Sequence, residues 1–310
     1  MSPCLMTGSQ SIVGIGRPRV DFLGTMRRFP DLGSKAELRQ FSIQGGGAAA
    51  TALIALLEWD YECRLIAKVS NDPFGQLIRG GFDLPGFDTG GLVTEPDRIS
   101  PFAFIALQQG QTMERAVFQT LGNVPPLEAA EVQLERIDGC AALLIDGTEP
   151  EAQLSASAYA QKRSIPVMLH LNRPVERLDE LIAGCDVLIS SERVTADIAP
   201  RGTADDSLRA MVKLGPRVAV ITMGQEGSVG IEGDKIVRQP IYADITPLER
   251  GGAGHIYFAG FVHATIEGRS LERRLQLASA AAGLSCRQIG AWAGVPSLEE
   301  TIALAWPDGQ

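Results

Sequence analysis

Short apolar segments rich in β-branched residues recur along this chain at a regular spacing. Their positions are 11–16 (SIVGIG), 63–69 (CRLIAKV), 102–108 (FAFIALQ), 141–147 (AALLIDG), 166–171 (PVMLHL), 186–191 (DVLISS) and 218–224 (VAVITMG). Several are apolar on both faces, as buried strands of a parallel sheet are. Helical spacing of apolar residues marks the intervening segments 48–59, 150–163 and 205–214. The alternation predicts an α/β fold in which helices flank both faces of a mostly parallel central sheet.

Two regions interrupt this alternation in the first half of the chain. Residues 17–44 are polar and irregular, and residues 97–121 hold two alternating runs joined by QQGQT, which predicts a β-hairpin. Together they are expected to form a small β-sheet lid that stands off the main sheet. The segment 254–304 is expected to be largely helical. We therefore take residues 1–310 as a single domain whose lid comes from about 17–44 and 97–121.

Charge and cysteine content restrict the possible binding partners of the chain and its possible cellular location. The net charge is −9 and the pI is about 5.0, so neither nucleic acid nor an anionic membrane is expected as a partner. A local basic pocket for a small anion is still compatible with this balance. The cysteines are far apart and form no CxxC pair, which argues against a disulfide framework or a structural zinc site. With no signal peptide and no membrane-length apolar run, a cytoplasmic location is expected. The five cysteines are Cys4, Cys63, Cys140, Cys185 and Cys286.

Two glycine-rich segments precede predicted helices. They are QGGGAAATALIALLEW, from Gln44, and GGAGH at 251–255. Successive backbone N–H groups at a helix start can hold an anion, and a cradle of this kind would stabilise a phosphoryl group in transfer. Each segment could equally be a tight turn into a buried helix. Neither matches the Walker pattern, and GIGRPR lacks the third glycine of a dinucleotide fingerprint, which makes a nicotinamide dehydrogenase improbable.

A third segment, VAVITMGQEGSVGI at 218–231, ends a predicted strand in Thr222, Met223 and Gly224, with Gly227 following. Carboxyl ends of strands line the ligand crevice of doubly wound sheets, so these residues are candidates for contact with a ligand. A simple hairpin with glycine turns explains the pattern equally well.

In order along the chain, these segments resemble the PfkB/ribokinase family of carbohydrate kinases. GIGRPRVD is similar to the family's opening strand, and QGGGAAATALIALLEWDYECRLIAKVSNDPFG to its N-terminal signature. VITMGQEGSVGI is similar to its nucleotide-side strand, and GGAGHIYFAGFVHATIEGRSLERRLQLASAAAGLSC to its C-terminal signature, whose core is D-T-T-G-A-G-D. IGAWAGVPSLEE resembles a tail found in a ketohexokinase-like branch. The resemblance implies a ribokinase-like fold, transfer of the ATP γ-phosphate to a sugar hydroxyl with Mg²⁺, and a homodimer formed through the lids.

The resemblance also implies roles for particular residues, matched by position. The last Asp of G-A-G-D takes the hydroxyl proton in the family, and His255 stands at that position here. The anion hole would be Gly252, Ala253 and Gly254. The sugar side would be Asp21, Gly46, Gly47 and the lid residue Arg115, and the nucleotide side would be Ser191, Glu192, Thr222, Gly224 and Gly227. No metal ligand is assigned.

Several positions depart from the family pattern. Glu249-Arg250-Gly251 replaces D-T-T, His170 and Ala50 replace an Asp and an Asn, and the N-x-x-E motif aligns with residues 191–194, which read SERV. A neutral imidazole is a competent general base near pH 7. It is longer than an aspartate, however, and a misplacement of about 1 Å can cost roughly a hundredfold in rate. Two hypotheses stay open: an ATP-dependent carbohydrate kinase acting on a ketose-like sugar with His255 as base, and an inactive homologue that binds a sugar, nucleotide or phosphorylated ligand as a sensor or partner.

Overall fold

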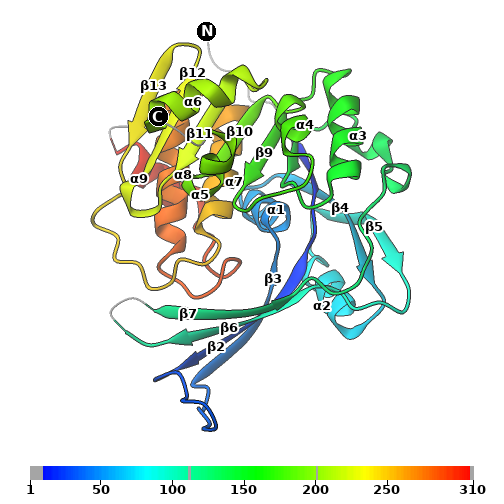
Figure 1. Cartoon of the computed structure of the whole chain (residues 1–310), viewed down its shortest axis with the longest axis vertical. Coiled ribbons are helices and arrows are strands. Elements are labelled where there is room, and N and C mark those ends of the chain that lie inside the picture. Colours follow the sequence, from blue (N-terminus) through cyan, green and yellow to red (C-terminus); the bar gives the residue numbers. More distant parts are fainter. Residues whose placement is uncertain (1–9, 111–112, 200–201, 308–310) are drawn as a thin grey trace.

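The computed structural model describes residues 10–110, 113–199 and 202–307. A nine-stranded sheet runs through its centre in the order β13-β12-β11-β10-β9-β8-β1-β4-β5 (Figure 1). Neighbouring strands are parallel except for the β11–β12 and β12–β13 pairs. The strands are β1 (Ser11–Ile15), β4 (Glu62–Ser70), β5 (Phe87–Glu95), β8 (Ala142–Ile145), β9 (Val167–Leu171), β10 (Val187–Ser191), β11 (Val218–Thr222), β12 (Ser228–Glu232) and β13 (Lys235–Gln239).

Helices cover both faces of this sheet and define two hydrophobic cores. Successive strand residues point to opposite faces, so Leu144 of β8 packs in the core that contains Phe258, while Leu143 and Ile145 pack in the other. The first core is built with α1 (Ala48–Glu58), α2 (Pro73–Gly81), α7 (Ala253–Ile266) and α8 (Leu271–Ser285), and α9 (Leu298–Ala305) packs on α8. The second is built with α3 (Pro150–Gln161), α4 (Leu178–Ala183), α5 (Glu192–Ile198) and α6 (Ala204–Lys213).

A separate four-stranded sheet stands away from the main body, at the bottom of Figure 1. Its order is β3-β2-β6-β7, formed by β2 (Arg19–Met26), β3 (Gln40–Gly46), β6 (Phe102–Gln108) and β7 (Glu114–Thr120). Its register places Leu23, Ile105 and Val117 in one row, and this row faces the main body. The neighbouring row, which includes Phe22 and Phe118, points the other way. The lid therefore has two different faces.

The predicted α/β architecture with a β-sheet lid is confirmed. β6 and β7 pair as the expected antiparallel hairpin, although residues 111–112 of its turn lie outside the described residues. The polar segment 17–44 holds β2 and most of β3, and so contributes two strands to the lid sheet. The hairpin explanation of 218–231 holds for the backbone, since β11 pairs antiparallel with β12. Strands β5 and β13 were not anticipated.

The structure also bears on the cysteines and on membrane-spanning helices. Cys4 lies outside the described residues, and the other four cysteines are free thiols. Among the described helices, none combines the length and apolar character needed to cross a membrane.

Candidate active site

The site begins where the order of strands in the main sheet reverses. From β1 the chain moves one way to β4 and β5, and then returns to add β8, β9, β10 and β11 on the other side. In open α/β sheets, ligands bind outside the carboxyl ends of the strands at this reversal. Arg17 follows β1, Thr148 follows β8 and Asn172 follows β9, and all three line a cavity of about 620 Å³. We call it the lid cavity.

The lid closes the other side of this cavity. Leu23, Ile105 and Val117, the apolar row of the lid, line it together with Asp21 and Gly46. Asp21 lies on β2 and is buried, and its carboxylate is within 2.6 Å of the Arg19 Nε. A Cβ at residue 46 would lie 2.4 Å from an Asp21 carboxylate oxygen, so a larger residue there would displace that carboxylate.

A second cavity, of about 520 Å³, lies at the carboxyl end of β11 beside α8, and we call it the α8 cavity. Thr222, Gly224 and Gly227 line its edge. Most of its remaining wall is apolar and comes from the segment before α7 and from α7 and α8, as a flat heteroaromatic ring would require. These wall residues include Ile241, Tyr242, Ile245, Pro247, Tyr257 and Ala282.

The start of α7 lies between the two cavities. Gly252 is its N-cap residue and lines the lid cavity, while Ala253 and Gly254 line the α8 cavity. The first N–H groups of a helix have no intrahelical partner and carry the positive end of its dipole. Gly252 has φ +80°, and a Cβ there would lie 2.2 Å from the Ala291 Cβ. Residues 252–254 therefore lie between the two cavities, and the Ala253 N–H is 3.4 Å from the Arg250 carbonyl oxygen.

His255, one turn into α7, faces the lid cavity. Its Nε2 lies 2.9 Å from the Asn172 Nδ2. An amide nitrogen can only donate, so Nε2 accepts and the imidazole is neutral. Burial lowers the pKa of His255 well below its usual range, and nearby His170, Arg19 and Arg115 lower it further.

His170 supports His255 from the sheet below. It lies on β9 and is buried, with its ring stacked on Phe258 at 5.3 Å and edge-on to His255 at 5.6 Å. Burial lowers the pKa of His170 to about 4, so it is also neutral near pH 7. Its Nδ1 is buried and has no hydrogen-bond partner in the described chain. These two histidines occupy the positions at which the family pattern has aspartates.

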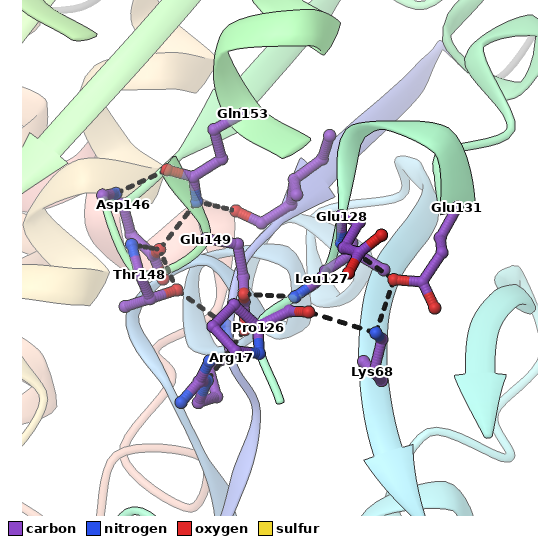
Figure 2. Close-up of polar contacts among 12 residues, drawn as sticks. Arg17, Lys68, Pro126, Leu127, Glu128, Glu131, Asp146, Thr148, Glu149 and Gln153 are labelled. Carbon is purple, nitrogen blue, oxygen red and sulfur yellow. Dashed lines mark hydrogen bonds and ion pairs between the residues drawn. The ribbon is translucent and has the colours of Figure 1, made fainter. Parts of the chain in front are cut away.

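Two buried carboxylates that line the lid cavity accept hydrogen bonds from the protein itself. Glu249 accepts a hydrogen bond from the Gly251 N–H at 2.5 Å and lies 3.7 Å from the Arg115 Nη1. The Asp146 carboxylate accepts hydrogen bonds from Thr148 and Gln153 (Figure 2). Both carboxylates are therefore held in place by neighbouring groups of the protein.

Ser191 and Glu192 line neither cavity. Ser191 ends β10 and Glu192 begins α5 with an exposed side chain, whereas the next residue, Arg193, lines the lid cavity. Within the described ranges, no group of three or more His, Cys, Asp or Glu side chains could hold a metal ion. Magnesium usually binds through one or two carboxylates plus substrate phosphates. A magnesium ion carried by nucleotide phosphates would therefore not need a cluster of that size.

Comparison with known proteins identifies the family. Residues 9–298 match the model of the pfkB family carbohydrate kinases. The chain belongs to this family. The PfkB chain is 26% identical over 298 residues to the ribokinase of Bacillus subtilis (strain 168), covering 95% of this chain and 99% of the relative.

Solved structures show the same fold. A candidate ribokinase from Agrobacterium tumefaciens superposes with a TM-score of 0.89 at 23% identity, covering 98% of this PfkB chain and 100% of that one. A candidate ribokinase II from E. coli, in complex with ATP and Mg²⁺, superposes with a TM-score of 0.82 at 17% identity, covering 96% and 99%.

Most of the residues suggested by the motifs gather at these two cavities in the PfkB chain. The exceptions are Ser191 and Glu192. The motifs did not single out Arg19, Asn172 or Arg173 as site residues, although Asn172 and Arg173 fall within the quoted segment LHLNRP. For Asn172 and Arg173, the signal that could have found them was their place directly after a buried strand, whereas Arg19 begins β2.

Proposed function

We propose that this PfkB-family chain transfers the γ-phosphate of ATP to a hydroxyl group of a carbohydrate. The observation that carries the proposal is the start of α7, where Gly252 lines the lid cavity and the next two residues, Ala253 and Gly254, line the α8 cavity. A nucleotide in the α8 cavity and an acceptor in the lid cavity would meet at this turn. The ATP and Mg²⁺ held by the E. coli relative, and the ribose kinase activity named for the Bacillus relative, support the same assignment.

In the proposed step, the acceptor hydroxyl oxygen forms a bond to the γ-phosphorus as the bond from that phosphorus to the β–γ bridging oxygen breaks. ADP leaves, and the hydroxyl proton passes to a base. The backbone N–H groups of Gly252, Ala253 and Gly254 would stabilise the charge that develops on the phosphoryl oxygens. Because phosphoryl transfer has a loose transition state, positioning and charge stabilisation contribute more than proton removal.

We assign the base position to His255. It lines the lid cavity and is neutral, so an acceptor hydroxyl that displaces the Asn172 amide would find a free lone pair on Nε2. The lowered pKa keeps the imidazole unprotonated but makes it a weak base. Asp21, Gly46 and Gly47 would contact the acceptor, and Thr222, Gly224 and Gly227 the nucleotide. A ketose is proposed as acceptor because the tail that resembles the ketohexokinase-like branch contributes residues 290–291 to the lid cavity.

One observation favours a second function. His255 has its Nε2 occupied by the Asn172 amide and a lowered pKa, and both features are also expected of a histidine that does not accept a proton from a substrate. In that case the chain would bind a sugar, nucleotide or phosphorylated ligand as a sensor, without turnover.

The experiment is acceptor-dependent ADP release, measured over a panel of pentoses, hexoses and ketoses for the native protein, His255→Asp and His255→Asn. The two variants have nearly the same shape, but only the aspartate accepts a proton. We expect turnover in the native protein and in His255→Asp, with kcat reduced by about a hundredfold or more in His255→Asn. A silent native protein beside an active His255→Asp variant would show that the histidine switched the reaction off, and would support the sensor.

We also propose a homodimer formed through the lids. The lid face that points away from the body exposes Phe41, Ile43 and Phe118, and apolar patches of this kind mark contact surfaces. Light scattering should give a dimeric mass for the native protein and a monomeric mass for Phe118→Glu. The control is Leu214→Glu, which alters an exposed leucine outside the lid. A monomeric native protein at micromolar concentration contradicts the proposal.

A further inference from the structure

We propose that the acceptor is an anionic carbohydrate, and that Arg173 and Arg193 bind its charged group. The inference rests on the proposed function, because it takes the lid cavity as the acceptor site. It names a class of sugar that carries a phosphate or a carboxylate away from the hydroxyl that receives the phosphoryl group.

Arginine dominates the charged lining of the lid cavity. Five arginines line it, although the whole chain has a net charge of −9. A neutral sugar needs hydrogen-bonding amides, hydroxyls and carboxylates, not a concentration of guanidinium groups. The five are Arg17, Arg19, Arg115, Arg173 and Arg193.

Three of these arginines are paired with carboxylates of the protein. The Arg19 guanidinium holds Asp21 with contacts of 2.6 and 3.2 Å. Arg115 lies 3.7 Å from Glu249. The pairing of Arg17 is shown in Figure 2.

Glu149, which is 1% exposed, holds Arg17. One of its carboxylate oxygens lies 2.8 Å from the Arg17 Nε, and the other accepts the Leu127 N–H at 2.7 Å (Figure 2). The Arg17 guanidinium is therefore fixed by the protein itself, and its charge is balanced there. A ligand would have to break a buried ion pair to use it.

Arg173 and Arg193 differ from the other three. In the part of the chain that the structure describes, neither has an ion pair or a hydrogen bond through its side chain. They follow β9 and β10, which are adjacent parallel strands, so both side chains start from the same edge of the sheet. Both line the lid cavity, and among the described residues neither has a carboxylate within ion-pair distance. A planar guanidinium binds phosphate and carboxylate groups with two parallel hydrogen bonds.

The ATP phosphates do not explain this pair. The α8 cavity has its own cation, Arg250, and receives the start of α7 through Ala253 and Gly254. Arg173 and Arg193 line the lid cavity and not the α8 cavity. The donor side thus has its own positive groups, and the two free arginines remain for the acceptor.

The test is calorimetric titration of the whole protein with matched sugars in the absence of nucleotide. D-Fructose is compared with D-fructose 6-phosphate, and D-glucose with D-gluconate, so that the two arms separate phosphate from carboxylate. The variants are Arg173→Gln, Arg193→Gln and the double substitution. The control is Arg209→Gln, which removes an exposed arginine of α6 that lines neither cavity.

We expect at least one anionic sugar to bind about tenfold or more tightly than its neutral parent. Each substitution at Arg173 or Arg193 should remove about tenfold of that affinity, and Arg209→Gln should remove none. Equal binding of anionic and neutral sugars, or no binding of either anionic sugar, would overturn the inference. The inference would also be overturned if the double variant still bound the anionic sugar but lost affinity for MgATP.

A parallel titration with MgATP separates this inference from the proposed function. MgATP binding and turnover without any preference for anionic sugars would reject the inference and leave the kinase assignment standing. Arginine-dependent binding of an anionic sugar by a protein that neither binds nor turns over MgATP would support the inference and reject the kinase.

Discussion

The two cavities on either side of the α7 start are built in opposite ways. The α8 cavity has a mainly apolar wall and one arginine, Arg250. The lid cavity has five arginines, three carboxylates and His255. An apolar slot with one cation suits a nucleotide, a ligand common to many kinases. The charged cavity on the other side holds what is particular to this chain.

The positions that differ from the family pattern lie on both sides of the α7 start. His255 and Glu249 line the lid cavity, and His170 lies beneath His255. Arg250, which follows Glu249, lines the α8 cavity together with Thr222, Gly224 and Gly227. The two sides are therefore best compared by substitutions that affect both cavities or only one.

The largest loss of turnover is expected from a substitution that distorts both cavities at once. Gly252→Ala puts a side chain at φ +80° and a Cβ 2.2 Å from the Ala291 Cβ, so the turn has to move. A shift of about 1 Å at such a site reduces turnover by roughly a hundredfold. MgATP and acceptor binding should weaken together. Gly80→Ala is the control, since a Cβ there meets no atom within 4 Å, and steady-state kinetics make the comparison.

A smaller effect should result from blocking one cavity alone. Ala282→Phe fills the wall of the α8 cavity and leaves the lid cavity untouched. We expect the Kd for MgATP to rise about tenfold or more, which corresponds to about 1.4 kcal/mol, with sugar binding unchanged. Ala303→Phe adds the same ring to an exposed position of α9 and should change neither. Loss of sugar binding in Ala282→Phe would show that the cavities are not separate.

We expect the smallest effect on activity from a substitution of His170. The same residue should make the free energy of unfolding depend on pH. Its pKa is about 4 in the folded protein and about 6.5 when unfolded, so the unfolded state binds the proton more readily. The stabilisation is complete above pH 6.5 and is lost as the pH falls towards 4. Between pH 7.5 and 5 this one group should lower the free energy of unfolding by about 2 kcal/mol.

The matched variant is His170→Leu, which is similar in volume and cannot titrate. Its unfolding free energy, from urea titrations at pH 7.5 and 5, should fall by about 2 kcal/mol less than that of the protein that retains His170. His263, whose pKa burial also lowers, is present in both proteins and cancels, and both carry His255→Asn so that the lowered pKa of His255 does not contribute. An identical pH dependence in the two proteins would contradict the account of His170 as a neutral buried group.

The sequence predicted the sheet best where strands are buried on both faces. Strands β1, β4 and β8 to β11 are continuous apolar runs, and each was anticipated. β5 contains two consecutive glycines, and β13 is a short edge strand with Lys235 and Arg238, so neither carries that signal.

The site residues also divide into those that the sequence could predict and those that it could not. The Gly252 turn was predictable because its backbone conformation requires glycine. Arg173 and Arg193 were not, because an exposed arginine after a strand is usually solvated, and only the folded sheet shows that both line one cavity. The pairing of Arg17 with Glu149 joins residues 132 positions apart, and no local pattern reports it.

The central claim is that a nucleotide and an acceptor meet at the start of α7. The most direct measurement is a crystal structure of the protein with a non-hydrolysable ATP analogue and Mg²⁺. The account predicts the adenine ring against Tyr242 and Ile245 in the α8 cavity, with the γ-phosphate within hydrogen-bonding distance of the N–H groups of residues 252–254. A nucleotide seated in the lid cavity, or one whose phosphates point away from α7, would contradict it.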